Sequence, residues 1–301
     1  MDDVQSAIES INKDKNFGLD LYSSNSNDEA SSLLNQCQNV VEENSKKPQI
    51  RILHHLACSG GTLLSKCIAA QPNVFLISEA HPHSKLHMQT QKPQYRPTDI
   101  ISLSRYANVP QAEALAEKIF VSDIEVLFKH VDKMGGVMVL RDHTHVDFCT
   151  SEKHVQEPTL MKLLAANFEI LPLASVRHPI DSYLALLNNG WVHFEPPTFD
   201  EYCKRYLAFV SHFNSKQIIK YETFIKKPVS EMKRLASKLA LPYTESFEDT
   251  FPLFSVTGDS GRGGDKIEAR ERRSIPGGLV KEIKASENFN KLIKKLKYKS
   301  L

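Results

Sequence analysis

The stretch Arg51-Ile-Leu-His-His-Leu-Ala-Cys-Ser-Gly-Gly-Thr-Leu-Leu-Ser-Lys66 decides the fold. Its apolar start predicts a buried strand, and the small residues from Cys58 to Thr62 predict a tight loop that opens a helix. Such a loop brings backbone N–H groups and the positive end of a helix dipole to one point, where both favour an anion. The stretch therefore predicts a phosphate-binding turn, and the alternative is a strand–helix turn that binds nothing.

The chain after this helix adds a carboxylate to the same place. A Gln71-Pro-Asn73 turn leads into a second apolar run that ends at Glu79. Because the carboxyl ends of parallel strands meet at one edge of a sheet, we expect Glu79 to lie next to the loop.

Three common motifs are absent from this loop. A P-loop NTPase needs G-x-x-x-x-G-K-[ST], whereas Gly61 is followed directly by Thr62, and Lys66 lies a turn into the helix. The loop also lacks the G-x-G-x-x-G dinucleotide pattern and the G-x-S-x-G elbow of serine hydrolases. A grip on a triphosphate with Mg²⁺ is therefore poorly supported, and a shorter anion such as a 5′-phosphosulfate fits better.

At this point the chain resembles the sulfotransferases, whose donor is 3′-phosphoadenosine 5′-phosphosulfate (PAPS). Ser59-Gly60-Gly61-Thr62-Leu63 is similar to their 5′-phosphosulfate loop, and it is followed by the same helix, turn and strand. The resemblance implies donor contacts from the residues of this loop: Cys58, Ser59, Gly60, Gly61, Thr62 and Leu63.

A second similar segment is Arg177-His-Pro179, at the end of an apolar run. The family holds the 3′-phosphate of the donor with an Arg here and a Ser eight residues later, and an Arg fork suits phosphate. Arg177 fits this pattern, but the later position is Ala185. Ser182, one helical turn earlier, is the candidate to replace that Ser.

Two further segments extend the resemblance over roughly residues 50–285. Ile218-Ile-Lys-Tyr221-Glu is similar to the family's strand–Tyr-Glu segment, so Tyr221 either contacts the donor nucleotide or packs at a strand end. The glycine-rich segment 257–266 is similar to a phosphate-closing loop, with Arg262 as the donor-binding residue; a solvated turn is the alternative.

The resemblance also points to Glu79 as the catalytic base. In the tyrosylprotein branch of the family a catalytic Glu follows the loop Ser by twenty residues, the spacing from Ser59 to Glu79. A carboxylate beside apolar residues can have its pKa raised into the range of a useful base. An N-cap or an ion pair is the structural alternative for Glu79.

Cys58 is the main departure from the family pattern. The family has a Lys or Arg before the loop Ser, where the cation acts on the leaving oxygen, and such a group contributes a few kcal/mol to lowering a barrier. Another cation must do this work, or the rate must suffer. The candidates are Lys66, His55, Arg262 and Lys266.

The segment from Arg141 to Asp147 is unusually polar and follows another apolar run. We expect it to line an acceptor pocket, with Asp142 or His143 assisting proton transfer. A metal site is disfavoured because there is no H-E-x-x-H motif and no third fixed ligand beside His143 and His145. The sequence therefore predicts no metal.

Composition indicates an ordinary globular protein. The chain has 301 residues, 41% hydrophobic and 25% charged, with a net charge of +2, which argues against nucleic acid as a partner. No signal peptide and no membrane-spanning run is visible, so we expect a cytoplasmic protein. Its cysteines are scattered, which fits a reducing compartment: Cys37, Cys58, Cys67, Cys149 and Cys203.

Strand-like and helix-like runs alternate after a polar N-terminal extension, residues 1–48. This alternation predicts that residues 49–301 form one α/β domain, a three-layer, P-loop-like parallel sheet flanked by helices. Strands are expected at 52–56, 74–77, 137–140, 170–176 and 217–221. Helices are expected near 62–70, 111–130, 158–166, 181–188, 199–213, 228–240 and 278–298.

The sequence thus favours a PAPS-dependent sulfotransferase that moves a sulfuryl group to a hydroxyl or amine of a small-molecule or carbohydrate acceptor. The alternatives are a P-loop phosphotransferase that uses ATP, and a sulfotransferase-fold nucleotide-binding protein without activity. Cys58 and Ala185 motivate the last of these.

Overall fold

The computed structural model describes Asn35 and residues 47–300, apart from residues 87, 90–92, 151–154, 259–265 and 270. The chain divides into two compact units, Met1–Lys47 and Pro48–Leu301. The second unit contains the sheet.

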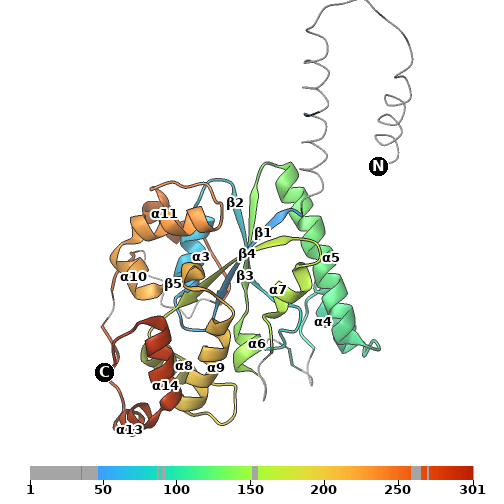
Figure 1. Ribbon diagram of the computed structural model, residues 1–301. Helices are drawn as coiled ribbons and strands as arrows, with labels where there is room; N and C mark the ends of the chain where they lie inside the picture. The colour runs from blue at the N-terminus through green and yellow to red at the C-terminus, as the bar shows by residue number, and fades with distance from the viewer. Residues whose placement is uncertain are drawn as a thin grey trace, which may run out of the picture. The chain divides into compact units, whose positions relative to one another are not determined.

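A five-stranded sheet forms the centre of this unit (Figure 1). The strand order is β2-β3-β1-β4-β5, and each neighbouring pair is parallel. The predicted α/β class with a parallel sheet is confirmed, and each strand overlaps its predicted range. The strands are β1 (Gln49–His55), β2 (Val74–Ala80), β3 (Val137–Asp142), β4 (Glu169–Val176) and β5 (Ile218–Lys220).

Helices cover both faces of the sheet because alternate side chains of each strand point to opposite faces. In β1, Leu53 packs into the core on one face and Ile52 into the core on the other. The first face carries α3 (Gly61–Ala69), α10 (Tyr221–Lys226), α11 (Pro228–Lys238) and α12 (Phe247–Thr250). The second carries α5 (Ala112–Lys133), α6 (His145–Cys149), α7 (Thr159–Leu164), α8 (Pro179–Asn189), α9 (Phe199–Ser211), α13 (Gly277–Ala285) and α14 (Glu287–Leu296).

Two predicted boundaries were wrong. The single helix expected over residues 278–298 is two helices, because the Ser286 hydroxyl donates to Asp200 (2.5 Å) and accepts the Phe289 N–H (3.0 Å), which begins α14 with an N-cap. The last strand ends at Lys220, and Tyr221 begins α10. The short helices α4 (Ile100–Tyr106), α6, α10 and α12 were not predicted.

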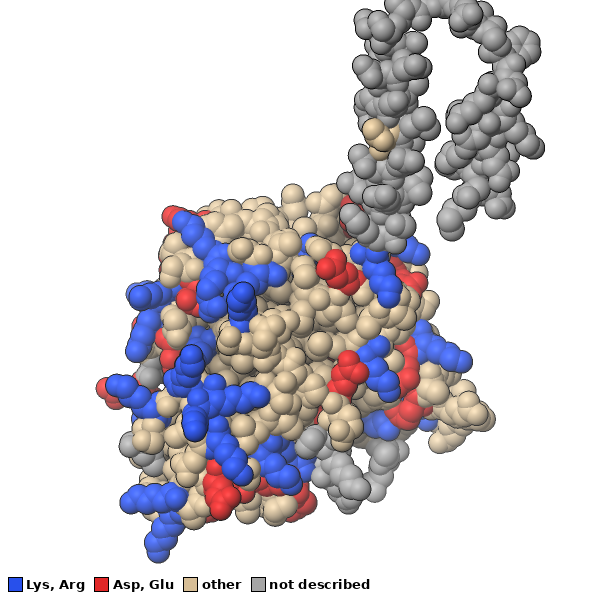
Figure 2. Space-filling model, viewed as in Figure 1, with Lys and Arg blue, Asp and Glu red and all other residues tan. Residues whose placement is uncertain are grey.

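The outer surface of α14 is strongly basic. Lys294 and Lys295 are exposed, whereas Leu292 and Leu296 are buried against the core that contains α9. Figure 2 shows many Lys and Arg side chains over this region and over α10 and α11. The basic end of the sequence is therefore the outer face of an amphipathic helix. No helix in the described part of the chain is long and apolar enough to cross a membrane.

We expect Phe209→Ala to lower the free energy of unfolding by about 3–5 kcal/mol, because it empties a fully buried site. Phe209 contacts Phe148 and Phe213, with ring centroids 5.6 and 5.3 Å away. Urea denaturation measures the change. Leu253→Ala is the control, because Leu253 is 80% exposed and should change stability by only about 0.5 kcal/mol. Equal losses in the two variants would contradict the assigned core.

Candidate functional site

The carboxyl ends of the strands open into one cavity of about 480 Å³. The loop after β1 lines it, as do side chains at the ends of β2, β3 and β4 and the start of α10. Segments far apart in the sequence thus meet at one sheet edge, as parallel topology requires. The strand-end residues at this cavity are Cys58, Glu79, Arg141, Arg177 and Tyr221.

The loop between β1 and α3 has an unusual backbone. Cys58 (φ 64°) and Gly60 (φ 89°) both adopt the left-handed region, and α3 begins at Gly61. Cys58, Gly60, Gly61, Thr62 and Leu63 line the cavity. Ser59 is buried, and its hydroxyl donates to the Leu56 carbonyl (2.7 Å). Ser59 therefore stabilises the turn from behind and is not one of the lining residues.

Each glycine of this loop faces an aromatic ring. A Cβ atom at Gly60 would lie 2.2 Å from Cδ2 of Tyr221, and one at Gly61 would lie 2.3 Å from Cδ2 of His55. Neither approach is possible for real atoms, so both rings require glycine. Packing alone therefore requires glycine at both positions of the loop, whether or not a ligand binds there.

Arg177 is fixed from three directions at the end of β4. Its Nη1 donates to the Cys58 carbonyl (3.2 Å), and its guanidinium carbon lies 5.1 Å from the centre of the Tyr221 ring. Its main-chain N–H donates to the Tyr206 hydroxyl (2.9 Å), which in turn donates to the Arg177 carbonyl (3.0 Å). This cation is therefore held against the loop in the cavity wall.

The residues expected to assist Arg177 lie in different places. Ala185 lines the cavity, whereas Ser182 is fully buried. The Ser182 hydroxyl donates to the Pro179 carbonyl (3.1 Å) and accepts from Tyr202 (2.8 Å). This geometry gives no support to Ser182 as a replacement phosphate ligand. Arg262 lies outside the described residues.

The Cys58 side chain brings no charge to the loop. Burial raises the pKa of its thiol to about 11, against the opposing effect of Arg177. The Asn189 amide donates to its sulfur (3.7 Å). Cys58 is therefore a neutral thiol at physiological pH, and the positive charge beside the loop comes from elsewhere.

Arg141 is a second cation beside the loop, in addition to Arg177, and it was not among the cations expected to replace a basic residue at position 58. It ends β3, lines the cavity and has only 1% of its surface exposed. A buried guanidinium must find hydrogen-bond partners for its N–H groups. The partners include His55 Nε2 (2.8 Å), Ser78 Oγ (3.1 Å), the Thr257 carbonyl (2.6 Å), Thr62 Oγ1 (3.2 Å) and Glu79 Oε1 (2.9 Å).

Glu79 is held in a strained position near the end of β2. Its φ of 55° is left-handed, and the register between β2 and β3 shifts between Ile77 and Ala80. Its carboxylate pairs with Arg141 and packs so closely on Gly258 that a Cβ there would lie 2.3 Å from Oε1. Strain of this kind is typical of functional sites. The bulge turns the Glu79 carboxylate toward the loop and the cavity.

Of the other candidate cations, two lysines line the cavity and one histidine is uncharged. Lys66 and Lys266 line the cavity. His55 is not a cation, because burial and the neighbouring Arg141 hold its pKa well below 6.5. It accepts a hydrogen bond from Arg141 instead.

Of the two groups expected to assist proton transfer, only His143 reaches the cavity. Its Nε2 lies 4.0 Å from Glu79 Oε2, and its Nδ1 is 3.1 Å from Ser84 Oγ. Burial lowers the pKa of His143, against the opposing effect of Glu79. Asp142 is buried, is bonded to His54 (2.7 Å) and Thr144 (2.7 Å), and does not line the cavity.

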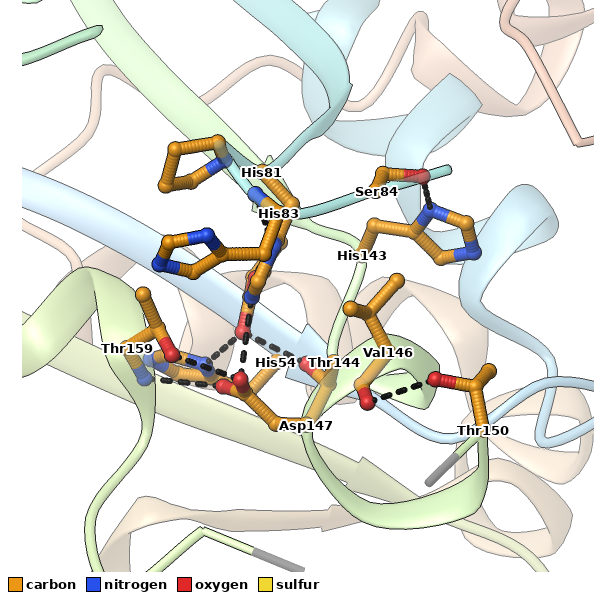
Figure 3. Close-up of polar contacts among 12 residues, drawn as sticks. His54, His81, His83, Ser84, His143, Thr144, Val146, Asp147, Thr150 and Thr159 are labelled. Atoms are coloured by element: carbon orange, nitrogen blue, oxygen red, sulfur yellow. Dashed lines mark hydrogen bonds and ion pairs between the residues drawn. The ribbon is translucent and has the colours of Figure 1, made fainter. Parts of the chain in front are cut away.

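A second buried carboxylate holds the segment that follows Glu79 (Figure 3). Asp147 accepts hydrogen bonds from His81 (3.0 Å) and from the N–H (2.8 Å) and hydroxyl (2.6 Å) of Thr159. Burial acts to lower the pKa of His81, but the bond to Asp147 raises it above 6.5. These contacts fasten the chain beyond β2 to α6 and α7. Within the described residues, no cluster of three or more His, Cys, Asp or Glu could hold a metal ion.

Comparison with known proteins finds similarity in structure alone. The sequence matches no family model and no curated protein. The structure is similar to the sulfotransferase domain from the curacin biosynthetic pathway, with 17% identity, a TM-score of 0.51, and coverage of 85% of this chain and 100% of that one. It is also similar to the sulfotransferase domain from the Synechococcus PCC 7002 olefin synthase, with 11% identity, a TM-score of 0.50, and coverage of 85% and 97%.

The chain has the sulfotransferase fold. At such low identity the likeness extends to the arrangement of strands and helices, and the roles of individual residues must be argued from the cavity itself. In this sulfotransferase fold, the strand–loop–helix turn and the strand-end side chains line one cavity at the edge of the sheet.

The cavity wall also includes imidazoles and apolar groups that the sequence did not show to be close together. His145 and His193 have ring centroids 5.8 Å apart, and Trp191 and Leu86 line the same cavity. Burial lowers the pKa of His145 to about 3, so it is neutral. No motif indicated this grouping, because its members come from three separate segments whose pairing only the fold decides.

We expect Gly61→Ala to destabilise the protein and to weaken anion binding, because the added Cβ would collide with the His55 ring. Overpacking of this kind costs about 1–3 kcal/mol. Thermal unfolding and binding of adenosine 3′,5′-bisphosphate measure the two effects. Gly277→Ala is the matched control, because a Cβ there meets no atom within 4 Å. Wild-type stability in Gly61→Ala would show that the ring does not occupy this place.

Proposed function

We propose that this chain is a PAPS-dependent sulfotransferase. The observation that carries the proposal is the position of Arg141, whose guanidinium joins Thr62 of the donor loop to the carboxylate of Glu79 inside one cavity. A cation between an anion-binding loop and a carboxylate suits the transfer of an anionic group to an acceptor that loses a proton.

The loop and Arg177 would hold the donor. The start of α3 provides N–H groups and a helix dipole for the 5′-phosphosulfate, and Thr62 adds a hydroxyl. Arg177 would hold the 3′-phosphate, and Tyr221 would contact the nucleotide. Arg273 and Lys266 also line the cavity and add to its positive charge.

Glu79 would accept the proton of the attacking hydroxyl or amine. The new bond forms between the acceptor atom and sulfur, and the bond from sulfur to the bridging oxygen breaks, so that the phosphate of the departing nucleotide keeps the electron pair. Arg141 would stabilise the charge that develops there, which is the work the family assigns to the residue at position 58. His143, whose Nε2 lies 4.0 Å from Glu79 Oε2, would share the proton.

The acceptor would lie against the imidazoles and apolar groups of the cavity wall. His143, His145, Trp191 and Leu86 offer hydrogen-bonding edges and apolar surface. Such a lining suits a small molecule or a sugar that carries a hydroxyl or amine.

Calorimetric titration with adenosine 3′,5′-bisphosphate tests the donor assignment. We expect wild-type protein to bind it and Arg177→Ala to weaken binding about 10- to 100-fold, the cost of losing a hydrogen bond to a charged group. Glu79→Gln should leave binding nearly unchanged and mainly lower turnover. Equal effects of the two substitutions on binding would contradict these roles.

The two alternatives predict different results in the same assays. Thermal stabilisation by ATP with Mg²⁺ but not by the bisphosphate would favour a phosphotransferase. Binding of the bisphosphate without transfer of labelled sulfate to any of a broad acceptor panel would favour a nucleotide-binding protein without activity, as the neutral Cys58 suggests.

We expect Arg141→Ala to lower the rate of sulfate transfer about 100- to 1,000-fold, the usual cost of removing one group that stabilises developing charge. Arg141→Lys should recover part of this loss, because it keeps the charge but not the fork. Transfer of labelled sulfate at saturating donor measures both. Arg234→Ala is the control, because it also removes an arginine from an ion pair with a glutamate, in this case Glu231 on α11 (2.5 Å). Near-normal transfer in Arg141→Ala would exclude Arg141 from catalysis.

A further inference from the structure

His55 occupies the space between the donor loop and Arg141. Its Nε2 accepts a hydrogen bond from Arg141 Nε (2.8 Å), and its Nδ1 lies 3.1 Å from the Leu56 carbonyl. Because a guanidinium can only donate, Nε2 must be the unprotonated nitrogen, and Nδ1 then carries the proton and donates to Leu56. The contacts therefore select one neutral tautomer.

The His55 ring has little freedom to move. It packs on Gly61, where a Cβ would lie 2.3 Å from the ring. Its main-chain N–H donates to Thr144 Oγ1 (3.2 Å), and that hydroxyl donates to the buried Asp142 (2.7 Å). His55 is 6% exposed. The imidazole is thus a fixed acceptor for whatever faces it.

Because His55 is a neutral acceptor, it orients the Arg141 guanidinium without changing its charge. An Asp or Glu bound to Nε would also orient the guanidinium, but it would cancel much of its charge. Arg141 already pairs with one carboxylate, that of Glu79 (2.9 Å), and an imidazole orients the fork without adding a second negative charge. The Nη atoms then reach Thr62 and Glu79, which line the cavity, and also Ser78.

We propose that His55 is a positioning residue that holds the Arg141 guanidinium toward the transferred sulfuryl group without adding a second negative charge beside that of Glu79. The inference rests on the proposed function, since it names what Arg141 is held for. The contact between the two side chains is a feature of the structure and can be tested apart from any activity.

The groups around His55 act against its protonation. Arg141 and His143 face it from the end of β3, and His54 precedes it in β1. Together with burial they hold the pKa of His55 well below 6.5. The unfolded chain therefore takes up a proton below about pH 6.5 that the folded chain does not, and His55 lowers stability progressively as the pH falls through that value.

Nitrogen-15 NMR of the histidines tests the contact itself. In wild-type protein, we expect His55 to remain the neutral Nδ1–H tautomer at pH 6. In Arg141→Met, which removes the donor and the cation, we expect the His55 pKa to rise and the tautomer preference to weaken. An unchanged His55 signal in Arg141→Met would overturn the proposed contact.

The rate of sulfate transfer tests whether the contact between His55 and Arg141 serves catalysis. We expect His55→Leu to lower transfer of labelled sulfate about 10- to 100-fold, the cost of misplacing a catalytic group by about 1 Å. Its affinity for adenosine 3′,5′-bisphosphate, which lacks the sulfuryl group, should fall less than about 3-fold. His55→Gln, whose side-chain oxygen can accept from Arg141, should restore most of the rate. His130→Gln, on the exposed side of α5, is the control for losing a histidine.

The outcomes separate the two proposals. Full transfer by a folded His55→Leu variant would overturn the positioning role, as would equal losses in His55→Leu and His55→Gln in both rate and binding. Failure of wild-type protein to bind the bisphosphate would instead refute the donor assignment, and the NMR result would still decide whether His55 holds Arg141.

Discussion

The burial of one guanidinium is the constraint on which the site depends. Arg141 is almost fully removed from water at the end of β3, and an unpaired charge there would be costly. Its hydrogen bonds are satisfied by residues of β1, β2, α3 and the segment around Thr257, so these elements must converge at the same edge of the sheet. The requirement that places Arg141 also places Thr62 and Glu79 next to each other.

The loop from Cys58 to Thr62 is shaped by the side chains that pack against it. Tyr221 and His55 each need a glycine opposite the ring, which accounts for Gly60 and Gly61 without any phosphate. A Ser-Gly-Gly-Thr turn is therefore weak support for anion binding by itself. Support for a functional role of this turn comes from Arg177, Arg141 and Glu79, which the fold brings to the same cavity.

The parallel sheet was predictable because its strands are short apolar runs separated by helical patterns, and burial on both faces demands such runs. The predicted ends of helices were wrong where a contact with a residue far away in the sequence decides where a helix begins. Ser286 begins α14 because it can reach Asp200, some 86 residues away. Burial of Ser182 depends on such a distant contact too, since its hydroxyl accepts from Tyr202 and Ser182 does not line the cavity.

By itself, the sequence determined the strand–loop–helix turn, the α/β class and the strand ends at which Glu79, Arg141 and Arg177 would appear. These depend on local periodicity and on glycine, which can be read along the chain. Only the tertiary structure decided that Cys58 is a neutral thiol, that His55 is an acceptor, and that Arg141 is the cation between loop and carboxylate. The charge states and hydrogen-bond partners of these side chains depend on burial and on distances between segments, and neither can be deduced from a local sequence pattern.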